Sequence, residues 1–461
     1  MSKTAERTLQ MAGSQWDDSD EFVQSRGEAA MELMEMILSQ KNLEEAMKAV
    51  KSNKGAPGID NMTVNEIDEY FKENMDEIKT SIMNKKYEPL PVRRVYIPKP
   101  NGKERPLGIP AVKDRVIQQA VAQVLSAMYD EHFSEHSHGF RPNRSASGAV
   151  AEALSYLNQG YEWVIDLDIE KFFDKVNHDK LISIIRERVK DDVTLHLLRK
   201  ILQAGVLEKG LVSPSEEGVP QGGPSSPILS NIYLDKFDKE LESRGLRFVR
   251  YADDVNIFVK SEMAADRVMK SVSSWLERKL FLKVSATKTK VVRPTKIIFL
   301  GFTFWRGSEG WKCKPANDRK KRLYDKIRAV LCRKKAVAIP LAITFMKVNE
   351  ITRGWINYFR IGSMKGFMEK YGQWLRHKIR VIIIKQWKNC ETIYKNLWKL
   401  NRMFKCNLTD VDIRKVSGSR LGWYRRCGLS TANYLLSPQI LAMKGADRPG
   451  LVNPLEYYLS N

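Results

Sequence analysis

The feature that most constrains the fold of this chain is a pair of adjacent carboxylates inside an apolar run. Residues 248–259 read FVRYADDVNIFV, and Asp253 and Asp254 stand side by side within it. Burying charged groups in such a run is costly unless an opposite charge compensates them, and two like charges together increase the cost. The pattern therefore predicts a cation beside this segment.

A second apolar stretch is interrupted by acids in a similar way. In WVIDLDI, residues 163–169, Asp166 and Asp168 alternate, so on a β-strand they share one face. If this strand pairs with the one that carries Asp253 and Asp254, three carboxylates converge, and a hard divalent cation such as Mg²⁺ prefers oxygen ligands of this kind. Carboxylates that hold two such ions are typical of phosphoryl transfer. Asp166 is equally well explained as a hydrogen-bonded structural acid, and we leave it out of the predicted site.

Composition indicates a polyanionic partner. The chain has 461 residues with 77 Lys and Arg against 55 Asp and Glu, a formal net charge of +22 and 43% hydrophobic residues. This length suggests about three domains, and this charge on a folded protein favours binding to nucleic acid. No apolar run reaches 18 residues and no signal peptide is recognisable, so we expect a cytoplasmic protein without a membrane partner. The five cysteines include no C-x-x-C pair, which argues against a zinc module.

The chain changes character near residue 305. Before it, strand and helix patterns alternate, including a hairpin pattern around an Asn-Gly turn at 92–110, and they predict helices backing an antiparallel sheet. After it, residues 312–335 hold eleven Lys or Arg against two Asp. Such a run is commonly a solvated helix face, but aromatic residues interleaved in the following helical segments favour an RNA-binding domain.

An ordered series of motifs carries a family resemblance. The chain resembles the group II intron reverse transcriptases, also called maturases, and most closely their compact bacterial members without an endonuclease domain. In chain order the motifs are GAPGID (55–60), IPKPNGKERPLGIP (97–110), HGFRPNRSA (138–146), DIEKFFDKVNHDKL (168–181), GVPQGGPSSPILSNIYL (218–234), RYADD (250–254), KTKVVRP (288–294), FLGFTF (299–304) and RGWINYF (353–359).

The resemblance implies an α/β (α+β) right-hand polymerase with fingers, a palm built on an antiparallel sheet, and an α-helical thumb or maturase domain. We expect an N-terminal extension with the first fingers helices over 1–85, and fingers and palm over 86–305. The helical thumb is expected over 306–388 and a small basic region resembling a DNA-binding domain over 389–461.

The resemblance also assigns the metal site. Asp168 and Asp253 match the principal metal ligands of the family, Asp254 matches the supporting third carboxylate, and Ile169 would lend a backbone carbonyl. The implied cofactor is a pair of Mg²⁺ ions, for which Mn²⁺ is a possible substitute.

Four residues match nucleotide contacts of the family. Lys99 and Arg105 would grip the incoming triphosphate, although both would also suit a solvated hairpin. Phe173 matches the bulky residue under the sugar, where a ribose 2′-hydroxyl would collide with the ring, and its alternative role is core packing. Gln221 matches a residue that lines the nucleotide and template site.

Two further basic residues each have two alternative interpretations. Arg141 is explained equally well as a template contact and as a structural arginine, and Lys288 either donates a proton to pyrophosphate or is a surface lysine. Contacts to nucleic acid are expected from the basic run after 312, at Arg319, Lys320, Lys321 and Arg322.

The chain departs from the family pattern in one loop. Where relatives usually read GLKVN, residues 281–285 read FLKVS, so Phe281 replaces a glycine and Ser285 an asparagine. This puts the details of the loop near the nucleotide in question. No HNH nuclease pattern is recognisable, so we expect no second-strand cleavage activity.

The function implied by the resemblance is an RNA-directed DNA polymerase that copies intron RNA into cDNA and binds its group II intron RNA to assist splicing and retrohoming. Its implied partners are that intron RNA, an RNA template with a DNA or RNA primer, target DNA and deoxynucleoside triphosphates, in a bacterial cytoplasm. Two alternatives remain: a non-catalytic RNA-binding splicing cofactor, and a reverse transcriptase of another bacterial lineage.

Overall fold

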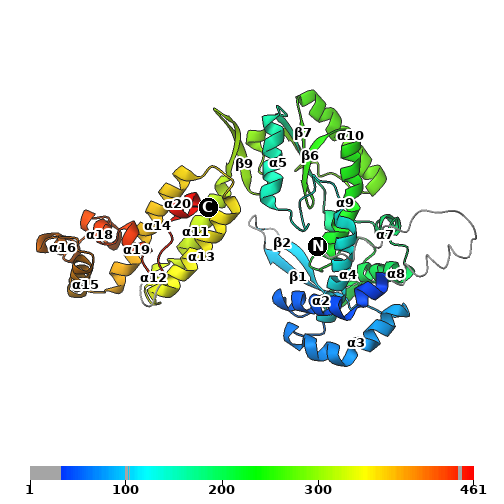
Figure 1. The fold of residues 1–461 in the computed structure, drawn as a ribbon, viewed down its shortest axis with the longest axis horizontal. Helices are drawn as coiled ribbons and strands as arrows, with labels where there is room; N and C mark the ends of the chain where they lie inside the picture. Colours follow the sequence, from blue (N-terminus) through cyan, green and yellow to red (C-terminus); the bar gives the residue numbers. More distant parts are fainter. Residues whose placement is uncertain (1–32, 99–101, 103, 445–448, 461) are drawn as a thin grey trace, which may run out of the picture. The chain divides into compact units, whose positions relative to one another are not determined.

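The structure, a computed structural model, describes residues 33–98, 102, 104–444 and 449–460. The chain divides into two compact units (Figure 1). The first unit is Met1–Ser145 with Trp163–Val291, and the second is Ala146–Glu162 with Val292–Asn461. The four-domain division expected from the sequence remains a prediction.

A four-stranded sheet forms the centre of the first unit. Its strand order is β6-β7-β3-β8, with β6 at Arg247–Tyr251, β7 at Asp254–Val259, β3 at Trp163–Asp168 and β8 at Lys290–Val292. Both β3 and β6 run antiparallel to β7, as expected. Every residue of β7 after Asp254 is buried, because the helices α9 (Ser226–Ser243) and α10 (Glu262–Leu280) contact this sheet.

A second sheet of the first unit carries the predicted hairpin. Its order is β2-β1-β4-β5, with β1 at Val92–Pro98, β2 at Glu104–Ile109, β4 at Val206–Glu208 and β5 at Leu211–Ser213. The antiparallel pairing of β1 with β2 confirms the hairpin.

The remaining helices of the first unit supply its apolar core. They are α2 (Gln40–Ser52), the 3₁₀ turn η1 (Val64–Glu66), α3 (Ile67–Met83), α4 (Val112–Asp130), α6 (Phe172–Lys175), α7 (His178–Arg186) and α8 (Asp192–Gln203). The side chain of Asn177 caps α7 by accepting a hydrogen bond from the Lys180 N–H at 2.8 Å, as its sequence position predicts.

The second unit is mainly helical. The hairpin of β9 (Phe302–Gly307) and β10 (Gly310–Pro315) packs on α5 (Ala146–Asn158), where the Asn158 Oδ1 accepts the Trp311 N–H at 2.8 Å. The other elements are η2 (Pro294–Lys296), α11 (Asn317–Val330), α12 (Arg333–Ala336), α13 (Leu341–Phe359), α14 (Lys365–Gln386), α15 (Cys390–Met403), α16 (Asp410–Ser417), α17 (Trp423–Arg426), α18 (Ser430–Leu435), α19 (Pro438–Ala442) and α20 (Pro454–Leu459).

Two long helices organise this unit, α13 and α14. Tyr371 of α14 is fully buried, and its hydroxyl lies 2.9 Å from the Thr352 hydroxyl of α13. Among the described helices, none is long and apolar enough to span a membrane. The mixed α/β first unit and the helical second unit confirm the predicted fold class.

Candidate active site

Three carboxylates gather at one end of the central sheet. Asp168 is the last residue of β3 and stands directly opposite Asp254, the first residue of β7. Directly opposed residues in an antiparallel pair have Cα atoms roughly 4.5–5.5 Å apart. Asp253 lies in the turn between β6 and β7, beside Asp254. The strand pairing predicted from the two acidic interruptions is therefore confirmed.

The electrostatics of the cluster follow from this crowding. Burial raises the pKa of Asp253; the Asp168 charge adds to this, while Arg105 and Lys288 oppose it. Asp254 is exposed as a residue, but partial desolvation of its carboxylate by the surrounding protein raises its pKa from 3.8 to about 6. The negative charges of Asp253, Asp166 and Asp168 contribute to this rise. The site thus carries negative charge that favours a cation.

Lys288 supplies part of the compensating positive charge. Its Nζ donates to both carboxylate oxygens of Asp168, at 2.8 and 3.0 Å. The loop that carries Lys288 is tied to the end of β3, because the Asp168 carbonyl accepts the Ser285 N–H at 2.9 Å and the Asp168 N–H donates to the Thr289 hydroxyl at 3.2 Å. Lys288 is thus placed directly at a predicted metal ligand.

The donor set fits a hard divalent cation, although it is not closed around one. In the described part of the chain, no group of three His, Cys, Asp or Glu side chains is arranged to hold a metal ion. Mg²⁺ is commonly bound through one or two carboxylates together with substrate phosphates, so a site completed only by substrate is compatible with these oxygens. Ile169 is buried and lies opposite Val284 in an isolated antiparallel bridge. The two hydrogen bonds of this bridge are made by the neighbours of Ile169, the Asp168 carbonyl and the Glu170 N–H.

The predicted triphosphate contacts lie on the hairpin. Arg105 is an exposed residue of β2, opposite Ile97 of β1, and its charge acts to lower the pKa of Asp253. A basic residue at this position can interact with anions near the carboxylates. Lys99 lies outside the described residues.

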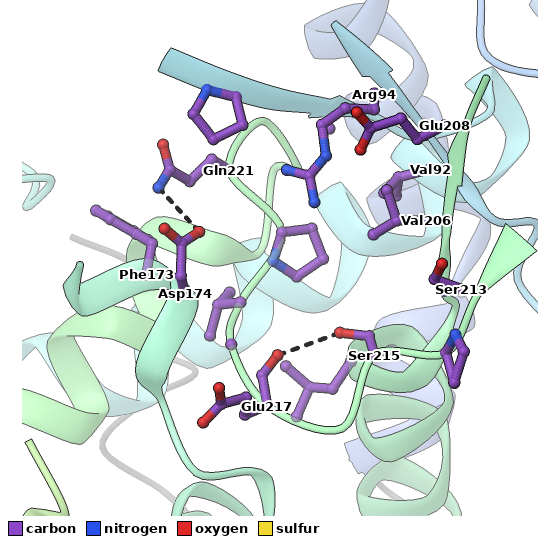
Figure 2. Close-up of a pocket in the computed structure, with 18 of the residues that line it drawn as sticks. Val92, Arg94, Phe173, Asp174, Val206, Glu208, Ser213, Ser215, Glu217 and Gln221 are labelled. Atoms are coloured by element: carbon purple, nitrogen blue, oxygen red, sulfur yellow. Dashed lines mark hydrogen bonds between the residues drawn. The ribbon is translucent and has the colours of Figure 1, made fainter. Parts of the chain in front are cut away.

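Phe173 and Gln221 line the same cavity, which has a volume of about 670 Å³ (Figure 2). The Gln221 Nε2 lies 3.5 Å from Asp174 Oδ1, and Arg94 and Glu208 form the wall across from them. The structure thus brings these two predicted residues together. None of the three clustered carboxylates is among the described residues that line this cavity.

Steric constraints explain why a glycine follows Gln221. Gly222 has a φ of +126°, and a Cβ on it would lie 2.4 Å from the Gly108 carbonyl oxygen. The Gly108 N–H also donates to the Gln221 carbonyl at 2.8 Å. This close backbone approach joins the loop 218–225 to β2.

Arg141 is buried and its donors are used internally. Its Nε donates to Asp130 Oδ1 at 2.7 Å, and Nη2 to the Asp130 carbonyl at 2.8 Å. Its Nη1 donates to the carbonyls of Ser134 and Ser137 at 2.6 and 3.0 Å. These bonds favour the structural interpretation, and the contact to nucleic acid remains a prediction.

The four predicted RNA contacts on α11 differ in exposure. Arg319 and Lys320 are half-buried, and the Lys320 ammonium lies 5.3 Å from the centre of the Phe367 ring. Burial lowers the pKa of Lys320. Lys321 and Arg322 are exposed, so these two are the better placed to contact a ligand.

A buried polar network, which was not predicted from the sequence, lies next to the carboxylates. Arg250 of β6 is fully buried and donates from Nε to Asp238 Oδ1 at 2.8 Å and from Nη2 to Asp238 Oδ2 at 2.5 Å. Its Nη1 donates to the Asn231 side chain at 2.9 Å and to the Ala252 carbonyl at 3.0 Å. Arg250 therefore holds the residue that directly precedes Asp253.

This network stabilises an unusual backbone conformation. Ala252 has a φ of +57°, which is unfavourable for a residue with a Cβ. The Asn231 Nδ2 donates to the Gly139 carbonyl at 2.9 Å, and a Cβ on Gly139 would lie 2.3 Å from the Ala252 nitrogen. A signal was present in the sequence, because Asn231 and Asp238 are seven residues apart and so lie on one face of a helix.

Two family models match this chain. Residues 97–304 match the reverse transcriptase (RNA-dependent DNA polymerase) family, and residues 320–401 match the group II intron, maturase-specific domain. Protein YkfC of Escherichia coli K12 is 34% identical over 310 residues, which cover 58% of this chain and 81% of that protein. The chain belongs to the group II intron reverse transcriptase and maturase family. The predicted resemblance is confirmed.

Other relatives are longer. The group II intron-encoded protein LtrA of Lactococcus lactis subsp. cremoris is 39% identical over 208 residues, 44% of this chain and 34% of that protein. A putative COX1/OXI3 intron 2 protein of Saccharomyces cerevisiae is 34% identical over 252 residues, which cover 54% of this chain and 28% of that protein. The chain thus spans about a third or less of these two relatives. A chain of a solved partial Cas6-RT-Cas1–Cas2 complex is 25% identical to this one, with a TM-score of 0.35. The match covers 54% of this chain and 43% of the chain in that complex.

The family membership makes this group II intron reverse transcriptase an RNA-directed DNA polymerase with a maturase domain. Reverse transcriptases of this family generally use divalent metal ions, and both domains are consistent with binding of group II intron RNA and RNA templates.

Proposed function

We propose that the chain copies intron RNA into cDNA by two-metal-ion nucleotidyl transfer and that it assists splicing and retrohoming of its intron. The observation that supports this most directly is the cross-strand pairing of Asp168 with Asp254, with Asp253 in the adjoining turn. Its substrates would be deoxynucleoside triphosphates and a primed RNA template, and retrohoming would require target DNA.

In this proposal the carboxylates of Asp168, Asp253 and Asp254 hold two Mg²⁺ ions, or Mn²⁺ as a substitute, with the Ile169 carbonyl as a further ligand. When bound, such ions lower the pKa of the attacking hydroxyl and neutralise the departing pyrophosphate. Arg105 and Lys99 would bind the triphosphate. Lys288 would exchange its contact with Asp168 for one with the pyrophosphate, to which its ammonium can donate a proton.

The test is primer extension on an RNA template with Mg²⁺ and deoxynucleotides. Asp253→Asn removes one carboxylate charge at nearly constant size, so extension should fall by about 10³-fold or more, while RNA affinity stays close to that of the wild type. Addition of EDTA should abolish wild-type extension. Extension that persists in EDTA would contradict the metal assignment.

A further inference from the structure

The second unit contains a small cavity with an unusual lining, between α11, α14 and α17. Its volume is about 210 Å³. Three cationic side chains and two aromatic rings line it together with aliphatic residues, and no acidic residue is among the described lining. The charged and aromatic members are Arg328, Arg333, Lys378, Trp374 and Tyr424.

The cations of this cavity are only partly neutralised. Arg328 pairs with Asp325 on the same helix at 2.9 Å, but both side chains are more than half exposed. Exposed pairs of this kind contribute little energy, so Arg328 can exchange its partner at small cost. The cavity therefore attracts an anion.

The aromatic rings stand directly beside these cations. The Arg328 guanidinium lies 5.8 Å from the centre of the Trp374 ring, and the Lys378 ammonium lies 5.2 Å from that of Tyr424. Tyr424 retains 54% of its accessible surface. An exposed ring flanked by cations is the arrangement on which nucleic acid bases stack.

The size of the cavity limits its occupant. Cavities for drug-sized ligands have volumes of roughly 300–1,000 Å³, so a cavity of about 210 Å³ accommodates a single flat ring. A paired base within an RNA helix stays stacked and is not available, whereas an unstacked base can be inserted. An acidic peptide would satisfy the cations but has no reason to prefer the rings.

We propose that this cavity binds one unstacked nucleotide of RNA, with its base against Tyr424 and Trp374 and the flanking phosphates on Arg328, Arg333 and Lys378. The inference rests on the proposed RNA-binding function and adds a specific site to it. It differs from the basic face of α11 in that it requires a base as well as phosphates.

The test compares the full chain binding to a short fluorescently labelled oligouridylate and to the same oligomer with alternate abasic nucleotides. The wild type should bind the intact oligomer at least about fivefold more tightly. Tyr424→Ala should reduce this ratio, and Tyr424→Phe, which keeps the ring, should preserve it. Tyr434→Ala is the matched control, because Tyr434 is 56% exposed and lies on α18, outside the cavity lining.

A second readout concerns the phosphates. Lys378→Gln should lower the slope of log affinity against log salt by about 0.7, the value of one single-strand phosphate contact. The proposal is overturned if Tyr424→Ala keeps the wild-type ratio, or if the wild type binds abasic and intact oligomers equally. It is also overturned if an acidic peptide competes with the labelled oligomer as effectively as unlabelled RNA does.

Primer extension separates this proposal from the proposed function. If the wild type extends primers and binds RNA, and Tyr424→Ala binds the oligomers with the wild-type ratio, only the nucleotide site is overturned. Wild-type protein that neither binds the oligomers nor extends primers overturns both.

Discussion

The two units of the molecule use charge in opposite ways. In the first unit, Asp253 and Asp254 adjoin Asp168, and the fully buried Arg250 and Asp238 hold the turn beside them. In the second unit, the cations of α11 lie largely at the surface, where Lys321 and Arg322 are exposed. A catalytic centre needs fixed short distances, whereas an RNA-binding face sums separate, salt-sensitive contacts. Single substitutions should therefore have large effects in the first unit and small ones in the second.

The largest effect is expected at Arg250. Arg250→Met leaves the Asp238 carboxylate buried without its partner, which should lower the free energy of unfolding by about 3–5 kcal/mol. Urea denaturation followed by circular dichroism measures this change. A loss below about 1 kcal/mol would show that this buried ion pair contributes little to stability.

A double variant distinguishes stability from positioning. Arg250→Met with Asp238→Leu removes both charges and should recover most of the stability. Primer extension should stay impaired, because the bond from Arg250 to the Ala252 carbonyl is still missing. Full recovery of extension would give Arg250 a purely structural role.

The next effect concerns the pH dependence of stability in the first unit. Asp114 is buried and accepts hydrogen bonds from the Tyr87 hydroxyl at 2.5 Å and the Leu90 N–H at 3.0 Å, and burial raises its pKa from 3.8 to about 6. Because the folded pKa is the higher one, the stabilisation is complete below about pH 4 and is lost as pH rises through about 6. The loss should reach about 3 kcal/mol.

Asp114→Asn tests this assignment because it cannot ionise. The difference in unfolding free energy between wild type and variant should change across pH 4–7 by about 3 kcal/mol, in the direction of a relative loss in the wild type. Urea titrations at several pH values measure it. A difference that does not vary with pH would mean that Asp114 ionises normally in the folded state.

Nucleotide selection should respond at Phe173 by a smaller amount. Phe173 lines the cavity shared with Gln221, and its ring contacts Phe172 in an edge-on arrangement at 5.2 Å. If the ring excludes a 2′-hydroxyl, Phe173→Ala should reduce discrimination against ribonucleotides by about tenfold, or about 1.4 kcal/mol. Single-nucleotide kcat/KM values for both sugars measure this, with Phe173→Leu as a bulkier control. Unchanged discrimination would leave Phe173 as a core residue.

Much of this architecture could be predicted from local patterns. The strand pairing that joins Asp168 to Asp254 followed from two acidic interruptions, because period-two alternation fixes which side chains share a face. The buried role of Arg250 could not be read in the same way, since its partners Asp238 and Asn231 come from a different element. Likewise, Lys320 and Lys321 are neighbours in sequence, and only helix packing decides that the first contacts Phe367 while the second is exposed.

The smallest effect is expected on the exposed face of α11. Lys321→Ala with Arg322→Ala should lower the slope of log RNA affinity against log salt by about 1.4–1.8, because each lost phosphate contact contributes roughly 0.7–0.9. The matched control is Arg267→Ala with Lys270→Ala, an exposed basic pair on α10 in the first unit, which should leave the slope unchanged. Splicing of the intron should weaken with the α11 variant and survive Asp253→Asn, because that substitution leaves the basic face intact. If the α11 variant binds and splices like wild type across a salt titration, Lys321 and Arg322 form only a solvated surface, and the contrast between the two units must rest on another part of the second one.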